Sequence, residues 1–530
     1  MSGRGEGAVK SNQRRRKRGA LGCLLCSAVL ALTGCGGGVP LRDETETTLP
    51  PATVTETAPI GDAALEYTAD RTLFLPRYDG TSLISLTDAV SCSAARLDEE
   101  SVIRALLAHD GTGVADSLGG DVQLSLYGAN PVEVSGNVAT VNLAASALQL
   151  DRKTLYLCGQ AMANTLTEFS NIHYVNILVM DKQIGLDLAS TLPTGALARS
   201  VVSDVGAAYE QALSQRVDTG EDPANKRLNA TVALYFPLSA VNGVMSEARN
   251  ISFSSQAPAD MVTRLLEELA EGPVTVSGSP TLPLLAGLLT AAPEVTEAAE
   301  GGGKLVTLRF DSTMDDMLAT AGVSRASCMC SLCYTLCTFL PNVTGITAYI
   351  GNERVDHVML GATTGLLFDE GVQRRADYAQ LLMDDCTLYL ANGEGTALEA
   401  VRRPVPFYQR TNPRVLLLEL FSGPSAEDGA QGTQAVLPAE LMTDADILGL
   451  ALNGDTLLVN LSSVFGNAGE GMTAQQDRLL AYAMVNTLLS DGRASRVCFF
   501  VNGETPSDLT GEIYWAGYFY RNLGFVRTQE

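Results

Sequence analysis

The densest group of reactive side chains is a set of cysteines on one expected helix: Cys328, Cys330, Cys333 and Cys337. The last three are spaced at i, i+3 and i+7, near one face of a helix, where thiolates could bind zinc. The same side chains could form a disulfide within the helix or between repeats, or pack as buried free thiols. Packing is the favoured interpretation because Cys328 continues an apolar stripe. We therefore predict neither a metal nor another cofactor, and keep Cys330, Cys333 and Cys337 as candidate ligands only.

Other residue types that could do chemistry are not arranged for it. Asp315 and Asp316, with Asp311 just before them, could bind a cation or act as a carboxylate pair, but a solvated loop is the favoured interpretation. None of the three histidines lies in a His-Glu-x-x-His motif: these are His109, His173 and His357. The sequence has neither a Gly-x-Ser-x-Gly motif nor a phosphate-binding glycine loop. We therefore predict that the protein is not an enzyme.

The N-terminus has the features of a signal sequence that directs the chain to the membrane. A cationic stretch at residues 14–18 precedes an apolar run at residues 20–32, which is too short to cross a bilayer, since a crossing takes about 20 residues. The run ends in Leu32-Thr33-Gly34-Cys35, which resembles the bacterial lipobox. This resemblance implies cleavage before Cys35 and lipidation of its thiol, which would anchor the chain on the outer face of the cytoplasmic membrane. A plain cleaved signal peptide is the alternative.

The remainder of the chain is strongly acidic. The whole sequence has a formal charge of -24, and residues 1–34 hold seven basic side chains and one acidic side chain, so the rest carries -30. Such a charge disfavours nucleic acid and favours basic or neutral protein partners. Residues 36–64 are rich in Gly, Thr, Pro and Glu, a composition typical of a disordered tether.

A repeat becomes visible when short motifs are compared. An expected helix carries Thr-Leu three times, and a glycine lies thirty residues after each threonine. The threonines are Thr165, Thr335 and Thr487. Copies two and three also share Glu-Leu-x-x-Gly-Pro at the end of an earlier helix, where a helix must stop. Its members are Glu268, Leu269, Gly272, Pro273, Glu419, Leu420, Gly423 and Pro424. Because Glu268 and Glu419 recur, we expect a shared structural role, such as holding a backbone amide.

The periodicity predicts one order of elements for each copy: strand, helix, one or two strands, helix, strand. Each helix has one apolar face, so we predict an α+β fold of three small tandem modules, each a sheet with two helices packed on one face. The expected organisation is a signal peptide (1–34), a lipidated cysteine with its tether (35–65), modules at 66–200, 229–370 and 385–530, and linkers at 201–228 and 371–384.

These motifs together resemble the GerMN domain of sporulation and spore germination. The likeness rests on the apolar opening strands (73–75, 234–236 and 388–390), Glu-Leu-x-x-Gly-Pro, the Asn-Thr-Leu helix and the closing turn 501–504. Copy two departs from it with Tyr334 in place of the Asn. The resemblance implies a ring-building-like fold and a lipid-anchored, extracytoplasmic scaffold for a sporulation or germination complex, with envelope proteins as partners.

Two other functions stay open from the sequence. A ligand-binding envelope lipoprotein would need a concave pocket with convergent polar groups between modules. A cell-wall enzyme would need a poised carboxylate pair or a zinc site. The scaffold is the favoured interpretation because three modules and a tether provide surface and reach.

Overall fold

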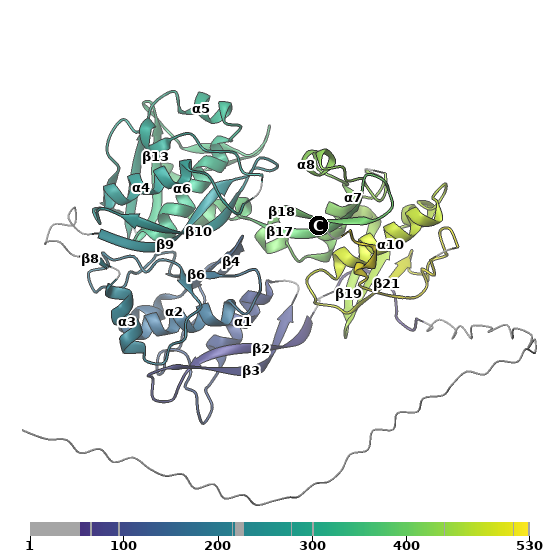
Figure 1. Ribbon diagram of the computed structural model, residues 1–530, viewed down its shortest axis with the longest axis horizontal. Coiled ribbons are helices and arrows are strands. Elements are labelled where there is room, and N and C mark those ends of the chain that lie inside the picture. Colours follow the sequence, from purple (N-terminus) through teal and green to yellow (C-terminus); the bar gives the residue numbers. More distant parts are fainter. Residues whose placement is uncertain are drawn as a thin grey trace, which may run out of the picture. The chain divides into compact units, whose positions relative to one another are not determined.

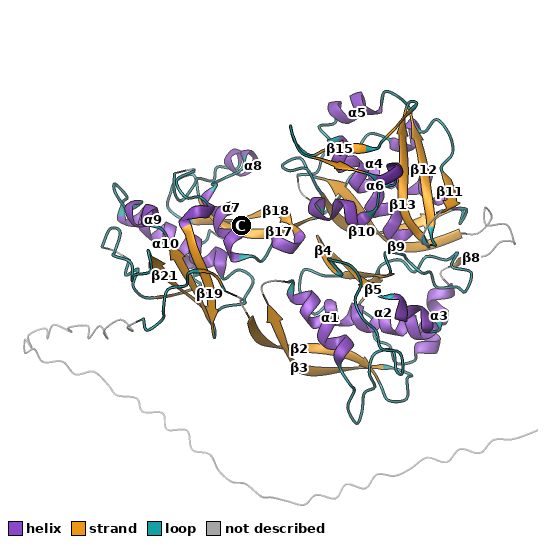
Figure 2. Ribbon diagram, turned by 180° about the vertical axis from the view of Figure 1, so that it is seen from behind, coloured by secondary structure: helices purple, strands orange, loops and turns teal. Residues whose placement is uncertain are grey.

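The computed structural model describes residues 54–63, 66–93, 96–214, 216–217, 227–276, 278–298, 302–438, 440–511 and 513–527. Within these ranges the same succession of elements occurs three times (Figures 1 and 2). A long antiparallel hairpin comes first, then a helix and a second pair of strands, then a long helix and a strand parallel to its predecessor. We call these segments repeat one (66–214), repeat two (227–382) and repeat three (383–527).

Repeat one holds two sheets joined by a helix. Its elements are β2 (Glu66–Pro76), β3 (Leu83–Ser93), α1 (Asp98–Ala108), β4 (Val132–Ser135), β5 (Val138–Leu143), α2 (Arg152–Leu166), β6 (Tyr174–Val179), β7 (Leu197–Ala198) and α3 (Val205–Ser214). The hairpin β2–β3 is a sheet of its own, and β4, β5, β6 and β7 form the other. Asp151 caps the start of α2 by accepting a hydrogen bond from the Thr154 amide. α2 then lies against both β2 and β6 and so connects the two sheets.

Repeat two follows the same plan with a longer insertion before its last helix. Its elements are β9 (Arg227–Pro237), β10 (Val244–Phe253), α4 (Pro258–Ala270), β11 (Glu294–Glu297), β12 (Lys304–Phe310), α5 (Met314–Thr320), α6 (Arg325–Phe339), β13 (Val343–Ile350), β14 (Glu353–Arg354), β15 (His357–Met359) and β16 (Gly365–Leu367). A short strand, β8 (Arg216–Val217), pairs with β9. α4 begins at a proline, whose missing N–H costs nothing in the first turn.

Repeat three closes the described chain. Its elements are β17 (Met383–Ala391), β18 (Leu398–Pro406), α7 (Pro413–Phe421), α8 (Ala426–Ala430), β19 (Ile447–Asn453), β20 (Thr456–Leu461), α9 (Ser463–Asn467), α10 (Ala474–Leu488), β21 (Arg496–Val501) and β22 (Tyr518–Tyr520). β20 and β21 are parallel, as are β5 and β6 in repeat one. α10 lies against β17, which gives it the place that α2 has in repeat one.

The structure confirms the α+β class and refines its architecture. In each repeat the opening hairpin is separate from the second sheet, so there are two small sheets where one was expected. The hairpin meets the rest of its repeat through the long helix, because α2, α6 and α10 pack on β2, β9 and β17. The second strand of each hairpin has no counterpart in the order of elements predicted from the sequence.

Both segments expected to be linkers contain helices. α3 occupies residues 205–214 and packs on α2, where the rings of Tyr156 and Tyr209 lie 5.8 Å apart. A 3₁₀ helix, η5 (Arg375–Leu381), occupies the second segment and buries Tyr378 completely. Each segment carries apolar side chains that a linker would leave in water, and burying them stabilises the ordered form.

Part of the expected tether is also ordered. β1 (Gly61–Asp62) adds a parallel strand to the outer edge of β19, and Asp62 forms two 2.7 Å contacts with the Arg414 guanidinium. The side-chain amide of Asn460 donates to the Pro59 carbonyl at 2.8 Å. Gly449 leaves room for this strand, since a Cβ there would lie 2.6 Å from that same carbonyl oxygen. Residues 54–63 therefore cover an edge that would otherwise be open to pairing.

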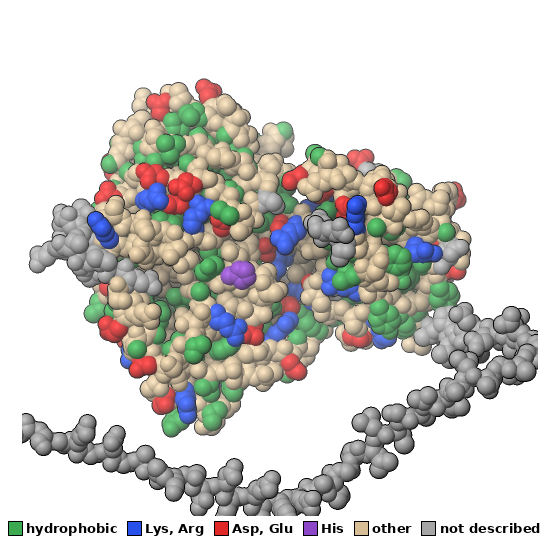
Figure 3. All heavy atoms as spheres, viewed as in Figure 1, with side chains coloured by type: hydrophobic (Ala, Val, Ile, Leu, Met, Phe, Trp, Pro, Cys, Tyr) green, Lys and Arg blue, Asp and Glu red, His purple; other side chains and the backbone are tan. Residues whose placement is uncertain are grey.

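The hydrophobic core is divided unequally among the repeats. Repeats one and two share one continuous cluster of buried apolar residues, which Phe407 of repeat three joins, while most apolar residues of repeat three form a cluster of their own. Met383 of repeat three packs in a small cluster with Leu238, Met245 and Val276 of repeat two. No helix in the described ranges has the length and apolar character needed to cross a membrane. On the face drawn in Figure 3, hydrophobic, acidic and basic side chains are interspersed. Repeat three therefore contacts the other two repeats through a few buried apolar residues together with ion pairs.

Candidate functional site at the junction of the three repeats

The recurrent threonine ties each long helix to its own opening hairpin. The hydroxyl oxygens of Thr165, Thr335 and Thr487 accept hydrogen bonds of 3.0 Å, 3.2 Å and 3.1 Å. The donors are the backbone amides of Phe74, Tyr235 and Tyr389, which occupy the same position in β2, β9 and β17. All three threonines are buried, so each bond satisfies groups that would otherwise be costly to bury.

The residue before the threonine distinguishes repeat two from its neighbours. Asn164 exchanges two hydrogen bonds with the backbone of Ser200, and Asn486 does the same with Asn522. Both partners lie 36 residues further on, so the asparagine fastens the end of its own repeat. Tyr334 replaces it in repeat two, and its hydroxyl lies 3.4 Å from a carboxylate oxygen of Glu133 in repeat one. The departure from the motif therefore coincides with a contact between repeats.

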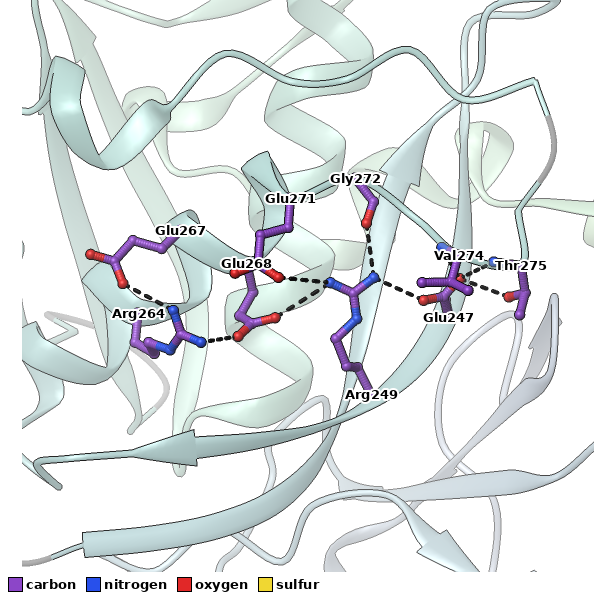
Figure 4. Close-up of polar contacts among 9 residues, drawn as sticks. All are labelled: Glu247, Arg249, Arg264, Glu267, Glu268, Glu271, Gly272, Val274 and Thr275. Carbon is purple, nitrogen blue, oxygen red and sulfur yellow. Dashed lines mark hydrogen bonds and ion pairs between the residues drawn. The ribbon is translucent and has the colours of Figure 1, made fainter.

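Glu-Leu-x-x-Gly-Pro ends its helix and binds an arginine from the preceding strand. Gly272 and Gly423 have φ of +75° and +78°, the left-handed conformation that terminates α4 and α7. Leu269 and Leu420 are fully buried beside them, and Pro273 and Pro424 follow the turn. In repeat two, Arg249 on β10 contacts Glu268 at 3.4 Å and donates to the Gly272 carbonyl at 2.8 Å (Figure 4).

Repeat three keeps this arrangement. Arg403 on β18 lies 3.4 Å from the Glu419 carboxylate and donates to the Glu419 carbonyl at 2.9 Å. The expectation that the glutamate holds a backbone amide was wrong, because its partner is the guanidinium. The arginine also satisfies a carbonyl at the helix end, where backbone acceptors have no partner within the helix.

The four clustered cysteines are packing residues of α6. All are buried, and the sulfur atoms of Cys333 and Cys337 lie 4.0 Å apart. Burial raises the pKa of the Cys328 thiol to about 12 and raises the pKa of Cys330 and Cys333 well above the usual value. A protonated thiol is a poor metal ligand. Within the described ranges, no three His, Cys, Asp or Glu side chains converge as a metal site.

The other residues examined for chemistry lie apart from one another. Asp315 pairs with Arg325 at 2.9 Å, and Asp311 accepts hydrogen bonds from Thr313, so the acidic doublet does not form a facing carboxylate pair. His109 accepts from the Gly111 amide through Nδ1. The lipobox Leu32-Thr33-Gly34-Cys35 lies outside the described residues, so the lipidation of Cys35 stays a prediction.

Side chains that the motifs did not indicate gather where the repeats meet. Arg410, after β18 in repeat three, contacts Glu99 of repeat one at 2.5 Å and Asp384 of its own repeat at 3.1 Å. Arg493 of repeat three contacts Asp98 of repeat one at 3.1 Å. Asp98 and Glu99 stand in the first turn of α1, where the helix dipole favours carboxylates.

Repeat two joins the same junction through its Ser246 and its Arg375. Ser135, at the end of β4, accepts from the Ser246 amide of repeat two at 3.0 Å and donates to the Met383 carbonyl of repeat three at 2.6 Å. Arg375 of repeat two forms a buried ion pair with Glu133 of repeat one. Removing one member of such a pair leaves an uncompensated buried charge, at a cost of about 3–5 kcal/mol.

A cavity of about 590 Å³ lies between these contacts, and all three repeats line it. Figure 3 shows acidic and basic side chains meeting in a hollow of this surface. Burial raises the pKa of Asp384 to about 7, in spite of the nearby Arg410 guanidinium. Oδ1 of Asp384, the carboxylate oxygen that does not pair with Arg410, accepts a hydrogen bond from the Gly136 amide at 3.0 Å, so this one side chain joins repeat three to repeat one.

Comparison with known proteins identifies the class to which repeat three belongs. Residues 387–507 match the family model Germane, described as sporulation and spore germination. This range begins in β17 and ends after β21, so the matched domain lies within repeat three. The family description names no catalysed reaction. No curated protein matches the chain.

Solved structures with some likeness include the tandem GerMN domains of the sporulation protein GerM from Bacillus subtilis. That structure is 19% identical, with a TM-score of 0.21, and the match covers 58% of this chain and 99% of that one. The first GerMN domain of the same protein is 18% identical, with a TM-score of 0.16, over 23% of this chain and 84% of that one. A putative lipoprotein from Clostridium perfringens is 17% identical, with a TM-score of 0.15, over 25% and 83%.

The recurrent threonine bond can be tested by Thr487→Val, which keeps the shape of the side chain and removes the acceptor. The Tyr389 amide then loses its partner in a buried place, so we expect a loss of about 1–3 kcal/mol in the free energy of unfolding. Denaturant titration measures this change. Thr68→Val, on the exposed side of β2, is the matched control and should change the free energy by less than about 0.5 kcal/mol. Equal effects of the two substitutions would contradict the assigned role.

The Asp384 carboxyl should give the junction a distinctive pH dependence. Its pKa is 3.8 when unperturbed and about 7 in the folded chain, so the folded state holds a proton that the unfolded state has lost. The stability from this group is full below pH 4 and is lost as pH rises to about 7, by about 1.4 kcal/mol per pH unit at most. Thermal unfolding of the wild type and of Asp384→Asn from pH 4 to pH 8 isolates the contribution of the Asp384 carboxyl to stability. The wild type should weaken relative to the variant up to pH 7 and then level off, whereas a constant difference would refute the assignment.

Proposed function

We propose that the chain is a lipid-anchored, extracytoplasmic scaffold of a sporulation or spore-germination complex. The junction carries this proposal, because buried ion pairs fix three repeats in one arrangement and so present a large surface of defined shape. The GerMN domain in repeat three supports the sporulation or germination context. Repeats one and two, which share its order of elements, are proposed as further copies of this domain.

The anchor proposal rests on Cys35 and the sequence around it. Chain length sets the reach of such an anchor, since residues 36–53 can span at most about 60 Å when fully extended. Residues 54–63 are fixed to repeat three, so the membrane connection would begin at that repeat. The scaffold would then sit on the outer face of the cytoplasmic membrane with repeat three closest to its tether.

The acidic charge supports protein partners of a particular kind. Outside residues 1–34 the chain carries a formal charge of -30, which favours basic or neutral surfaces on its partners. Such a charge repels anionic lipid head groups, so the proposed acyl anchor is what would hold the protein at the membrane.

The proposal is tested by locating a C-terminally tagged copy in the native host through starvation, with Cys35→Ala as the control. We expect the wild type to concentrate at the septum that forms the spore and the Cys35→Ala variant to lose this enrichment, since it has no thiol to lipidate. Even labelling of the envelope that is unchanged by starvation would contradict the sporulation role. Unchanged membrane association of Cys35→Ala would contradict the anchor.

A further inference from the structure

We propose that the cavity at the junction of the three repeats binds a short peptide that carries both a free ammonium group and a free carboxylate. The proposal is independent of the scaffold function, because it concerns the chemistry of the cavity wall alone. It concerns the same residues that join the repeats, so a bound peptide would contact all three repeats at once.

The size and lining of the cavity suit such a ligand. Its volume of about 590 Å³ falls within the range of about 300–1,000 Å³ that is common for small-molecule sites. Repeat one contributes the start of α1 and the turn after β4, repeat two contributes β10, and repeat three contributes β17 and the segment after α10. Most lining side chains are polar or charged, which disfavours an apolar ligand.

Polar atoms that lack a hydrogen-bond partner are concentrated in this wall. The described residues hold eleven buried side-chain nitrogen or oxygen atoms without such a partner, and five of them belong to residues that line the cavity. Three are guanidinium Nε donors and two are carboxylate acceptors: Arg71, Arg410, Arg493, Asp98 and Asp384. Both carboxylate oxygens lie 3.1 Å from a guanidinium nitrogen, so they are ion-paired without an aligned hydrogen bond.

The lining of the cavity as a whole presents two kinds of polar group, guanidinium donors and carboxylate acceptors. Guanidinium N–H groups bind carboxylate oxygens, and carboxylates accept from an ammonium group or a peptide N–H. Asp384 is only 4% exposed and Asp98 only 8% exposed, so a ligand would contact the wall mainly through more exposed side chains such as Arg402 and Asp385. A peptide with free ends offers both donors and acceptors, whereas a simple anion or a simple cation offers one kind.

The balance of charge in the wall points to a ligand that is neutral overall. Four arginines and five acidic residues line the cavity. The guanidinium groups of Arg410 and Arg493 are already neutralised by the carboxylates of Glu99 and Asp98. A net anion or a net cation would disturb this balance, but a dipolar molecule preserves it.

Two charged side chains at the rim of the cavity, Asp385 and Arg402, form no ion pair within the described residues. Asp385 on β17 and Arg402 on β18 lie diagonally opposite on neighbouring strands, and Arg402 is exposed at the mouth of the cavity. His173 of repeat one, also exposed, lines the same cavity from another side. One carboxylate and one guanidinium so placed could receive the two ends of a peptide.

Isothermal titration of the detergent-extracted full chain with triglycine tests the proposal. N-acetyl-triglycine, which lacks the ammonium group, and triglycinamide, which lacks the carboxylate, are the matched probes. We expect triglycine to bind, and each blocked form to bind at least tenfold more weakly. The absence of triglycine binding at millimolar concentration, or equal binding of all three probes, would overturn the proposal.

A pair of variants then places the site. Arg402→Gln should weaken triglycine binding at least tenfold, because it removes an exposed guanidinium from the rim. Arg527→Gln is the matched control, since that side chain is 67% exposed and does not line the cavity, and its affinity should equal that of the wild type. Thermal unfolding of both variants verifies that they are folded. Unchanged affinity in Arg402→Gln would show that triglycine binds elsewhere and would overturn the proposal.

Discussion

The Arg410 guanidinium, buried between Glu99 of repeat one and Asp384 of repeat three, is the contact on which the arrangement of the molecule depends. Repeats one and two share a hydrophobic core, whereas repeat three buries most of its apolar residues separately and joins the others through Phe407 and Met383. Its attachment therefore combines these apolar contacts with directional polar contacts, in which Arg493 and Ser135 reinforce Arg410. Such contacts tolerate only one geometry, because a shift would leave charges buried without partners. Hydrophobic contact alone is less specific, since it is not directional.

Much of the internal plan of each repeat was predictable from the sequence. The spacing of Thr165, Thr335 and Thr487 identified the long helix, and the structure shows the physical reason: the hydroxyl must reach one amide of the opening strand. Glu-Leu-x-x-Gly-Pro likewise indicated a helix end, which the left-handed glycines provide. Motifs of this kind persist because a local hydrogen bond or a backbone conformation demands a particular residue type.

Elements with mixed polarity were harder to predict. Only two of the eleven residues of β3 are buried, so it lacks the clear alternation of a half-buried strand. The sequence predicts linkers around α3 and η5, because their few apolar side chains, such as Tyr209 and Tyr378, find partners only in the folded chain. Residues 54–63 have a composition typical of disorder, yet the open edge of β19 gives them a place. The junction itself could not be predicted, because its ion pairs join residues more than 240 positions apart.

We infer that polar contacts hold repeat three in one position against repeat one. Pulsed electron paramagnetic resonance between spin-labelled unnatural amino acids at Thr68 and Glu394, both exposed, measures this most directly. We expect a single narrow distance distribution in the wild type and a broad one in Arg410→Gln, where Glu99 and Asp384 lose their shared partner. A broad distribution in the wild type, or a narrow one that Arg410→Gln leaves unchanged, would contradict it.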